Sequence, residues 1–148
     1  MVEHSEDFTG CLAGNLRAAA RAVTRTYDEA LRPHGLRVTQ VAVLAAVRRH
    51  GPSGPTALSR ALGTERSALA RELRVLERRR LVAFTPDPAD GRARQVGLTP
   101  EGAALLAECA PAWRTAQREM TERLGARPFD DLVATATRLT DALAEPRP

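Results

Sequence analysis

Arginine side chains recur along one short stretch of the chain at a spacing that suits contact with nucleic acid. The residues after Gly63 predict a helix from Glu65 to about Arg79, with Leu69, Leu73 and Leu76 on one face. A guanidinium group can bind a guanine edge through two hydrogen bonds, or it can bind a phosphate. We therefore expect DNA contacts from this helix and the turn before it, made by Thr64, Arg66, Ser67, Ala68, Arg71 and Arg74.

A second pair of arginines, Arg92 and Arg94, follows the turn-forming residues Asp90 and Gly91. Two short β-prone runs, 81–85 and 95–98, flank this turn and predict a hairpin. An arginine at the tip of such a hairpin can enter the minor groove of DNA, where the potential is most negative. We expect Asp90 to hold the guanidinium group of Arg92 in place.

The elements that must position these arginines are predicted from caps and breakers. Thr39 is expected to cap a helix that ends near Gly51, Thr56 a short helix that Gly63 ends, and Thr64 the arginine-rich helix. Two helices joined across a glycine turn predict a helix-turn-helix, and a hairpin directly after it predicts a winged helix. The fold class is therefore mainly α with a small β-hairpin, and the winged-helix core is expected to span 36–99.

Amphipathic helices are predicted on both sides of this core, in 8–34 and 100–145. Thr99, Pro100 and Glu101 form a favourable helix start, and Gly125 is expected to end that helix. The winged helix is already a complete small core, so the outer apolar stripes are expected to dimerise the chain. A two-fold dimer presents two recognition helices to a palindromic site, with half-sites about 34 Å apart. An intramolecular bundle is the alternative.

The charge distribution agrees with this arrangement. All 22 basic residues of the 148-residue chain are arginine, and the net charge is +4. Residues 48–98 hold eleven arginines and five acids, a net charge of +6, whereas the rest of the chain is neutral or acidic. A basic middle third predicts a face that meets a polyanion. The 27 alanines and 18 leucines favour helices.

Several classes of protein are not expected from this sequence. No apolar run approaches the roughly 18 residues of a membrane span, and the acidic start of the chain has no signal core. Two cysteines form neither a disulfide framework nor a zinc site, so we expect a cytoplasmic protein without a metal or cofactor. The chain also has no phosphate-binding glycine loop and no HExxH motif, so an enzyme is not expected.

The sequence resembles the MarR family of bacterial transcription regulators over 11–124. The resemblance lies in 15–44 (NLRAAARAVTRTYDEALRPHGLRVTQVAVL), 64–82 (TERSALARELRVLERRRLV) and 87–102 (DPADGRARQVGLTPEG). Asp90-Gly91-Arg92 is similar to the Asp-x-Arg of the family's wing tip. The resemblance implies a homodimeric winged-helix repressor of neighbouring genes, released from DNA by small phenolic or lipophilic effectors or by oxidation.

The chain departs from the family pattern in and after the arginine-rich helix. Arg80 stands where glycine is common, so the helix end is expected to lose its left-handed residue. Ala68 and Ala70 stand where hydroxyl side chains are frequent, and Glu72 where a neutral polar residue is frequent. These changes concern the DNA sequence that is bound and not the mode of binding.

An effector pocket is expected between the dimer helices and the winged helix, with Asn15, Arg21, His34, Thr39 and Trp113 as candidates. Arg21 is suited to bind a carboxylate. Trp113 in the core and His34 in a helix-end loop are the structural alternatives.

The cysteines offer a redox hypothesis. The family's peroxide-sensing position aligns with Ala13, two residues after Cys11, so a structural Cys11 is the alternative to a redox-active one. Cys109 is expected in the core.

The leading functional hypothesis is a dimeric, sequence-specific DNA-binding repressor relieved by a small-molecule effector. The alternatives are a winged-helix protein-interaction module without specific DNA binding, and a thiol-based redox regulator that uses Cys11. DNA binding that weakens steeply with salt separates the repressor hypothesis from the protein-interaction module.

Overall fold

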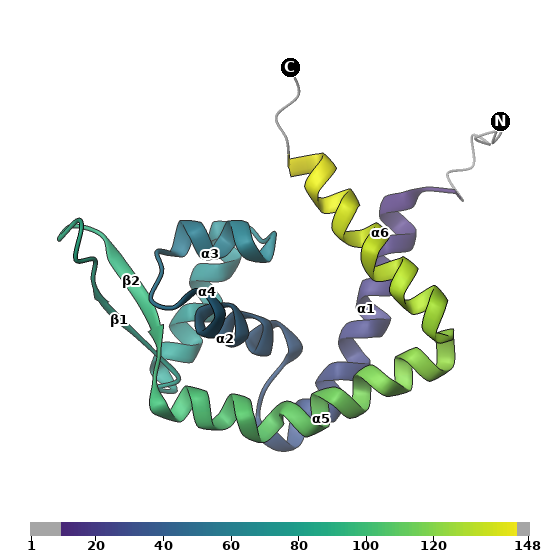
Figure 1. The fold of residues 1–148 in the computed structure, drawn as a ribbon, viewed down its shortest axis with the longest axis horizontal. Helices are drawn as coiled ribbons and strands as arrows, with labels where there is room; N and C mark the ends of the chain where they lie inside the picture. Colours follow the sequence, from purple (N-terminus) through teal and green to yellow (C-terminus); the bar gives the residue numbers. More distant parts are fainter. Residues whose placement is uncertain (1–9, 145–148) are drawn as a thin grey trace.

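The computed structural model describes residues 10–144, which form a mainly helical chain with one β-hairpin (Figure 1). Phe8, the expected start of the first helix, lies outside the described residues. The elements in chain order are α1 (Leu12–Leu31), the 3-10 turn η1 (Arg32–His34), α2 (Val38–His50), α3 (Pro55–Leu62), α4 (Arg66–Arg78), β1 (Val82–Pro86), β2 (Arg94–Leu98), α5 (Pro100–Leu124) and α6 (Ala126–Ala144).

Helices α2, α3 and α4 and the hairpin form the predicted winged helix. Its core is made of fully buried aliphatic side chains, among them Leu44, Leu58, Leu73 and Val96. The two strands pair antiparallel from Val82↔Leu98 to Pro86↔Arg94. The backbones of Ser53 and Val96 exchange two further hydrogen bonds, so the segment before α3 adds a bridge to the hairpin.

Three of the predicted helix caps are wrong. Helix α2 begins at Val38, one residue before Thr39, because the Asp28 carboxylate accepts the Val38 N–H at 2.7 Å. Helices α3 and α4 begin after Gly54 and Glu65, and no side chain caps either start, so neither Thr56 nor Thr64 is a cap. Both helices follow a residue with extended backbone, and Pro55 occupies the first turn of α3.

The predicted start of α5 is confirmed. The Thr99 side chain accepts the Gly102 N–H at 3.0 Å, and Pro100 occupies the first turn. The Thr99 hydroxyl also donates to the Arg80 carbonyl at 2.6 Å, and the Thr99 N–H donates to the Leu81 carbonyl at 3.2 Å. These bonds close the base of the hairpin, because Thr99 follows its second strand and Arg80 precedes its first.

The expectation that Arg80 removes the left-handed residue after α4 is wrong. Arg80 itself adopts the left-handed conformation, with φ +58°. Its N–H donates to Glu77 at 2.8 Å and the Leu81 N–H donates to Leu76 at 2.9 Å, which is the Schellman pattern. Leu76 and Leu81 are both buried, so their packing holds the turn closed even without glycine.

Helices α1, α5 and α6 form a frame beside the winged helix (Figure 1). Tyr27 of α1 stacks on Trp113 of α5 with ring centroids 6.2 Å apart, and its hydroxyl donates to the side-chain carbonyl of Gln117. The first half of α1 and all of α6 bury no side chain. Their apolar stripes remain open to solvent within one chain: Leu12, Leu16, Val23, Leu132, Val133 and Leu143.

Candidate nucleic-acid interface

The arginine-rich helix is α4, the second helix of the helix-turn-helix, which we call the recognition helix. Leu69, Leu73 and Leu76 are buried, and this apolar face fixes the rotation of the helix about its axis. The predicted contact residues Arg66, Ser67, Arg71 and Arg74 are all exposed, whereas Thr64 and Ala68 are half-buried. The fold therefore brings the predicted contact residues together, and four of them are free to reach a groove.

The tip of the hairpin presents Arg92. Asp90 does not hold the guanidinium group as expected: its carboxylate accepts the backbone N–H of Arg92 at 3.0 Å. The Asp90 carbonyl also accepts the Ala93 N–H at 2.9 Å, which tightens the turn. Asp90 thus sets the backbone of the tip and leaves the exposed Arg92 side chain available.

Arg94 is not a second tip residue. Its guanidinium carbon lies 5.2 Å from the centre of the Phe84 ring, and the group donates to the Phe84 carbonyl at 3.5 Å. This cation–π contact joins the two strands of the hairpin. The sequence-based expectations gave Phe84 no role, and its contact with Arg94 is diagonal in the hairpin, because Phe84 pairs with Val96 and Arg94 pairs with Pro86.

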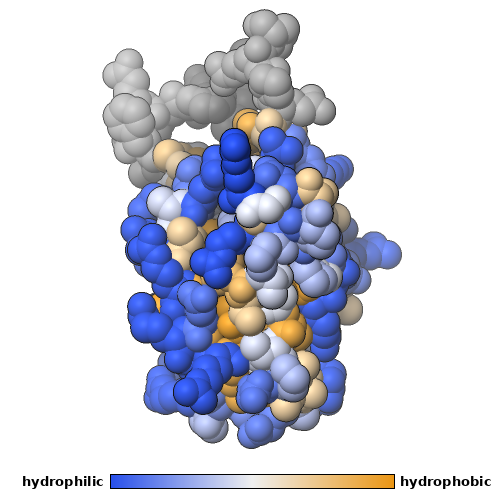
Figure 2. Space-filling model, turned by 90° about the vertical axis from the view of Figure 1, so that its left-hand side faces the viewer, coloured by the Kyte–Doolittle hydropathy of each residue, from blue (hydrophilic) through white to orange (hydrophobic). Residues whose placement is uncertain are grey.

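The face of the molecule that carries the hairpin is mostly hydrophilic, with a narrow band of hydrophobic residues (Figure 2). The exposed arginines of α4 and of the hairpin belong to the middle third of the chain, where the net charge is +6. Such a surface suits a duplex, because phosphate contacts position the protein while contacts to base edges specify the sequence.

Glu72, noted as a departure from the family, is paired with an arginine at the start of α2. Its Oε1 accepts a hydrogen bond from the Arg37 guanidinium at 3.2 Å, and the Glu72 side chain is only 23% exposed. Its Oε2 is buried and has no hydrogen-bond partner among the described residues. The pair links the start of α2 to the recognition helix across 35 residues of sequence, a contact that no local pattern predicts.

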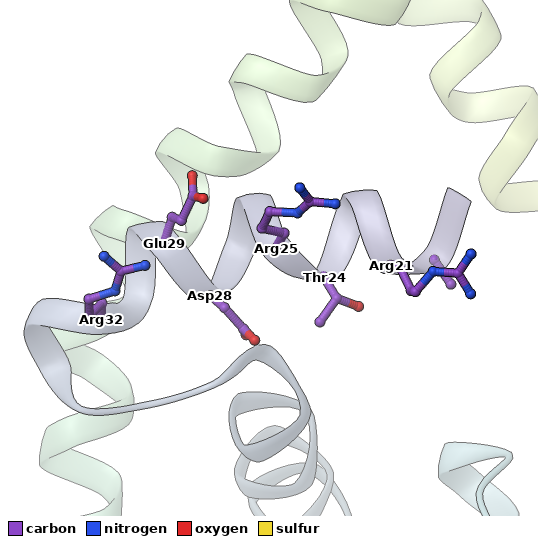
Figure 3. Close-up of a pocket in the computed structure, with 7 residues that line it drawn as sticks. Arg21, Thr24, Arg25, Asp28, Glu29 and Arg32 are labelled. Carbon is purple, nitrogen blue, oxygen red and sulfur yellow. The ribbon is translucent and has the colours of Figure 1, made fainter. Parts of the chain in front are cut away.

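In the part of the chain that the structure describes, the effector candidates Arg21 and Thr39 line two different grooves. Arg21 lines a shallow groove of about 410 Å³ along α1, together with Thr24, Arg25 and Asp28 (Figure 3). Thr39 lines a separate groove of about 370 Å³ between α2 and the recognition helix.

The other three candidates make structural contacts. Asn15 donates to the Cys11 carbonyl at 2.9 Å at the start of α1. His34 lies 3.5 Å from the Glu108 carboxylate, in the turn that ends α1. Trp113 packs half-buried against the core beside Tyr27. The contacts of His34 and Trp113 agree with the structural alternatives stated for these two positions.

The two cysteines differ in environment. Cys109 is fully buried, as expected, and its thiol donates to the Leu106 carbonyl at 3.4 Å. Burial raises the pKa of the Cys109 thiol. Cys11 is exposed at the residue before α1. Within 10–144 no cluster of three potential metal ligands occurs, and none of the helices is long and apolar enough to cross a membrane.

The fold and this surface define the class of the protein as a winged helix-turn-helix DNA-binding protein. The sequence profile of the MarR family matches residues 34–93. The chain is 33% identical over 108 residues to the HTH-type transcriptional repressor NicR of Pseudomonas putida, covering 73% of this chain and 68% of NicR.

Two solved structures are similar over most of the chain. One is the M. tuberculosis transcriptional regulator MosR in complex with DNA, with a TM-score of 0.78, 34% identity, and 91% and 99% of the two chains covered. The other is BpsR of Bordetella bronchiseptica, whose DNA binding is regulated by 6-hydroxynicotinic acid, with a TM-score of 0.80, 25% identity, and 88% and 93% covered. The chain belongs to the MarR family, and it is a DNA-binding transcription regulator and not an enzyme.

Proposed function

We propose that this regulator is a homodimer that represses adjacent genes from a palindromic operator in double-stranded DNA and that a small effector releases it. The observation that carries the proposal is the pairing of two exposed basic elements on one core: Arg66 and Arg71 on α4, and Arg92 at the hairpin tip. The helix suits the major groove and the tip suits the neighbouring minor groove. A bacterial protein that binds chromosomal DNA is expected in the cytoplasm.

The uncovered apolar stripes of α1 and α6 support the dimer. Leu12 is 59% exposed, Leu132 48% and Val133 52%, on helices that bury little or nothing within one chain. Covering such side chains with a second copy removes apolar surface from water. A two-fold pairing of these helices places one recognition helix on each half-site.

The effector is proposed to be a small phenolic or lipophilic molecule, bound where the dimer helices face the winged helix. The groove of Arg21 and the groove of Thr39 support this site, since they lie on α1 and between α2 and α4. The name of NicR and the ligand of BpsR indicate that similar proteins repress transcription and respond to a small aromatic acid. Arg21 is the side chain suited to a carboxylate on such a ligand.

The proposal is tested by measuring the affinity of this chain for the duplex DNA upstream of its own gene. We expect specific binding that weakens steeply with salt. Replacement of a base-reading arginine, Arg66→Ala or Arg71→Ala, is expected to cost about 1–3 kcal/mol, and Arg92→Ala to lower affinity without unfolding the chain. Arg118→Ala on α5, whose guanidinium contacts only Thr115 among the described residues, is the matched control.

Absence of binding at low salt would refute DNA recognition and favour the protein-interaction alternative. Unchanged affinity of the Arg92 variant would refute the minor-groove role of the tip. The dimer is tested separately by sedimentation of a Leu132→Arg variant, with Ala134→Arg on the opposite face of the same helix as control. A wild-type monomer at micromolar concentration would refute the dimer.

A further inference from the structure

A basic concavity lies at the junction where α1 ends, the chain enters α2, and α4 ends. Its volume is about 410 Å³, and Asp28, Arg32, Arg37, Gln40 and Arg79 are among the residues that line it. Arg32 comes from η1, Arg37 precedes α2, and Arg79 is the C-terminal cap of α4. Three guanidinium groups from three elements therefore converge on one depression of the surface.

The charges of the lining residues do not cancel. Three arginines face one acid, Asp28, so the ionisable lining carries a net charge of +2. The Asp28 carboxylate is already engaged at 2.7 Å by the Val38 N–H at the start of α2. Arg37 is also paired at 3.2 Å with Glu72, which lies outside the lining, so the three arginines exceed the two carboxylates by one positive charge.

The hydrogen bonds that these arginine side chains make within the protein use few of their N–H donors. Arg37 donates to Glu72 at 3.2 Å and Arg79 donates to the Gly35 carbonyl at 2.7 Å. The Arg32 guanidinium makes no hydrogen bond or ion pair with any other described residue, whereas the Arg32 backbone carbonyl accepts the Gly35 N–H at 2.9 Å. Since each guanidinium has five N–H donors, most of the donors in the concavity remain available to a ligand.

We propose that Arg32, Arg37 and Arg79 bind a small multivalent oxyanion, of the phosphate or polycarboxylate type. Planar guanidinium groups match both chemistries, because each can present two parallel N–H donors to a pair of oxygens. The bound oxyanion joins the end of α1 to the end of the recognition helix. The site does not depend on the DNA contacts, since α4 has 13 residues and its C-terminal end lies about 20 Å along the axis from Arg66.

Calorimetric titration of the full chain, free of DNA, tests the site with pyrophosphate and citrate as probes. Ionic strength is held constant with sodium chloride, so that general screening stays the same. We expect saturable binding of at least one probe with one site per chain. Arg32→Gln and Arg79→Gln are each expected to weaken it by about tenfold or more, as for loss of a charged hydrogen bond.

Arg66→Gln is the matched control, because it removes one arginine from the DNA-binding end of the same helix. It is expected to leave oxyanion binding unchanged, whereas Arg32→Gln is expected to leave DNA affinity unchanged. Pyrophosphate binding without citrate binding assigns the site to phosphate-type ligands, and the reverse assigns it to polycarboxylates. Absence of saturable binding by both probes, or equal loss with Arg66→Gln and Arg32→Gln, overturns the proposal.

Discussion

Replacing Arg80 with glycine is expected to stabilise the protein. Arg80 closes α4 with φ +58°, a conformation in which its Cβ crowds the following carbonyl oxygen. The cost for an L-residue is about 1–2 kcal/mol. Glycine avoids this cost but loses about 0.4–1 kcal/mol through the greater freedom of the unfolded chain. The net expectation for Arg80→Gly is a gain of about 0.5–1 kcal/mol in the free energy of unfolding per chain.

The arginine side chain contributes little to offset this gain. It is exposed, and the bond to Glu77 and the bond from Thr99 both use the Arg80 backbone, while the other bond of the turn joins Leu81 to Leu76. Arg80→Ala is therefore the matched control, because it removes the same charge but keeps the Cβ atom. The alanine variant is expected to be no more stable than the parent chain.

Urea unfolding followed by circular dichroism measures the difference, with all chains at one concentration so that association contributes equally. In thermal unfolding, a gain of about 1 kcal/mol corresponds to roughly 2–4 °C for a chain of this size. If Arg80→Gly unfolds at the same urea concentration as Arg80→Ala, the left-handed strain assigned to Arg80 is refuted.

Three further predictions concern the core and the thiols. Gly102→Ala is expected to destabilise the fold by about 3 kcal/mol in urea unfolding, because the new Cβ would lie 2.0 Å from the Leu81 carbonyl oxygen; near-parental stability would contradict that contact. Tyr27→Phe is expected to lower the free energy of unfolding by about 1 kcal/mol, because the hydrogen bond to Gln117 is lost. An unchanged free energy of unfolding would show that water fully replaces the tyrosine hydroxyl. Because the Cys109 thiol is fully buried and burial raises its pKa, we expect it to react with a thiol reagent near neutral pH only after unfolding. Cys11→Ser is expected to remove any fast-reacting thiol and any peroxide response of DNA binding, and a fast thiol in that variant would contradict this.

The winged helix was predictable because its signals are local. The leucine spacing of α4, the breaker Gly63 and the turn at Asp90-Gly91 each determine structure within a few residues. The Thr99 cap is local too, and it was confirmed. The exposed arginines follow from the same periodicity, since the buried leucines fix which face they occupy.

The features that were missed depend on distant residues. Helix α2 begins at Val38 and not after Thr39 because Asp28, ten residues earlier, supplies the acceptor. From the sequence Glu72 is only an unusual residue for its position, because its partner Arg37 lies 35 residues earlier and is brought close by the fold. Arg21 and Thr39 could not be assigned to one site from sequence, because they line different grooves in the fold.

The closed base of the hairpin has a consequence for how such a regulator can diversify. Thr99 fixes the chain after β2 to the residues before β1, so the hairpin is a loop whose two ends are held together. Residues can be added or removed at the tip, near Gly91, without moving α4 or the start of α5. The length of the hairpin and the exposed side chains of α4 can therefore change independently during evolution.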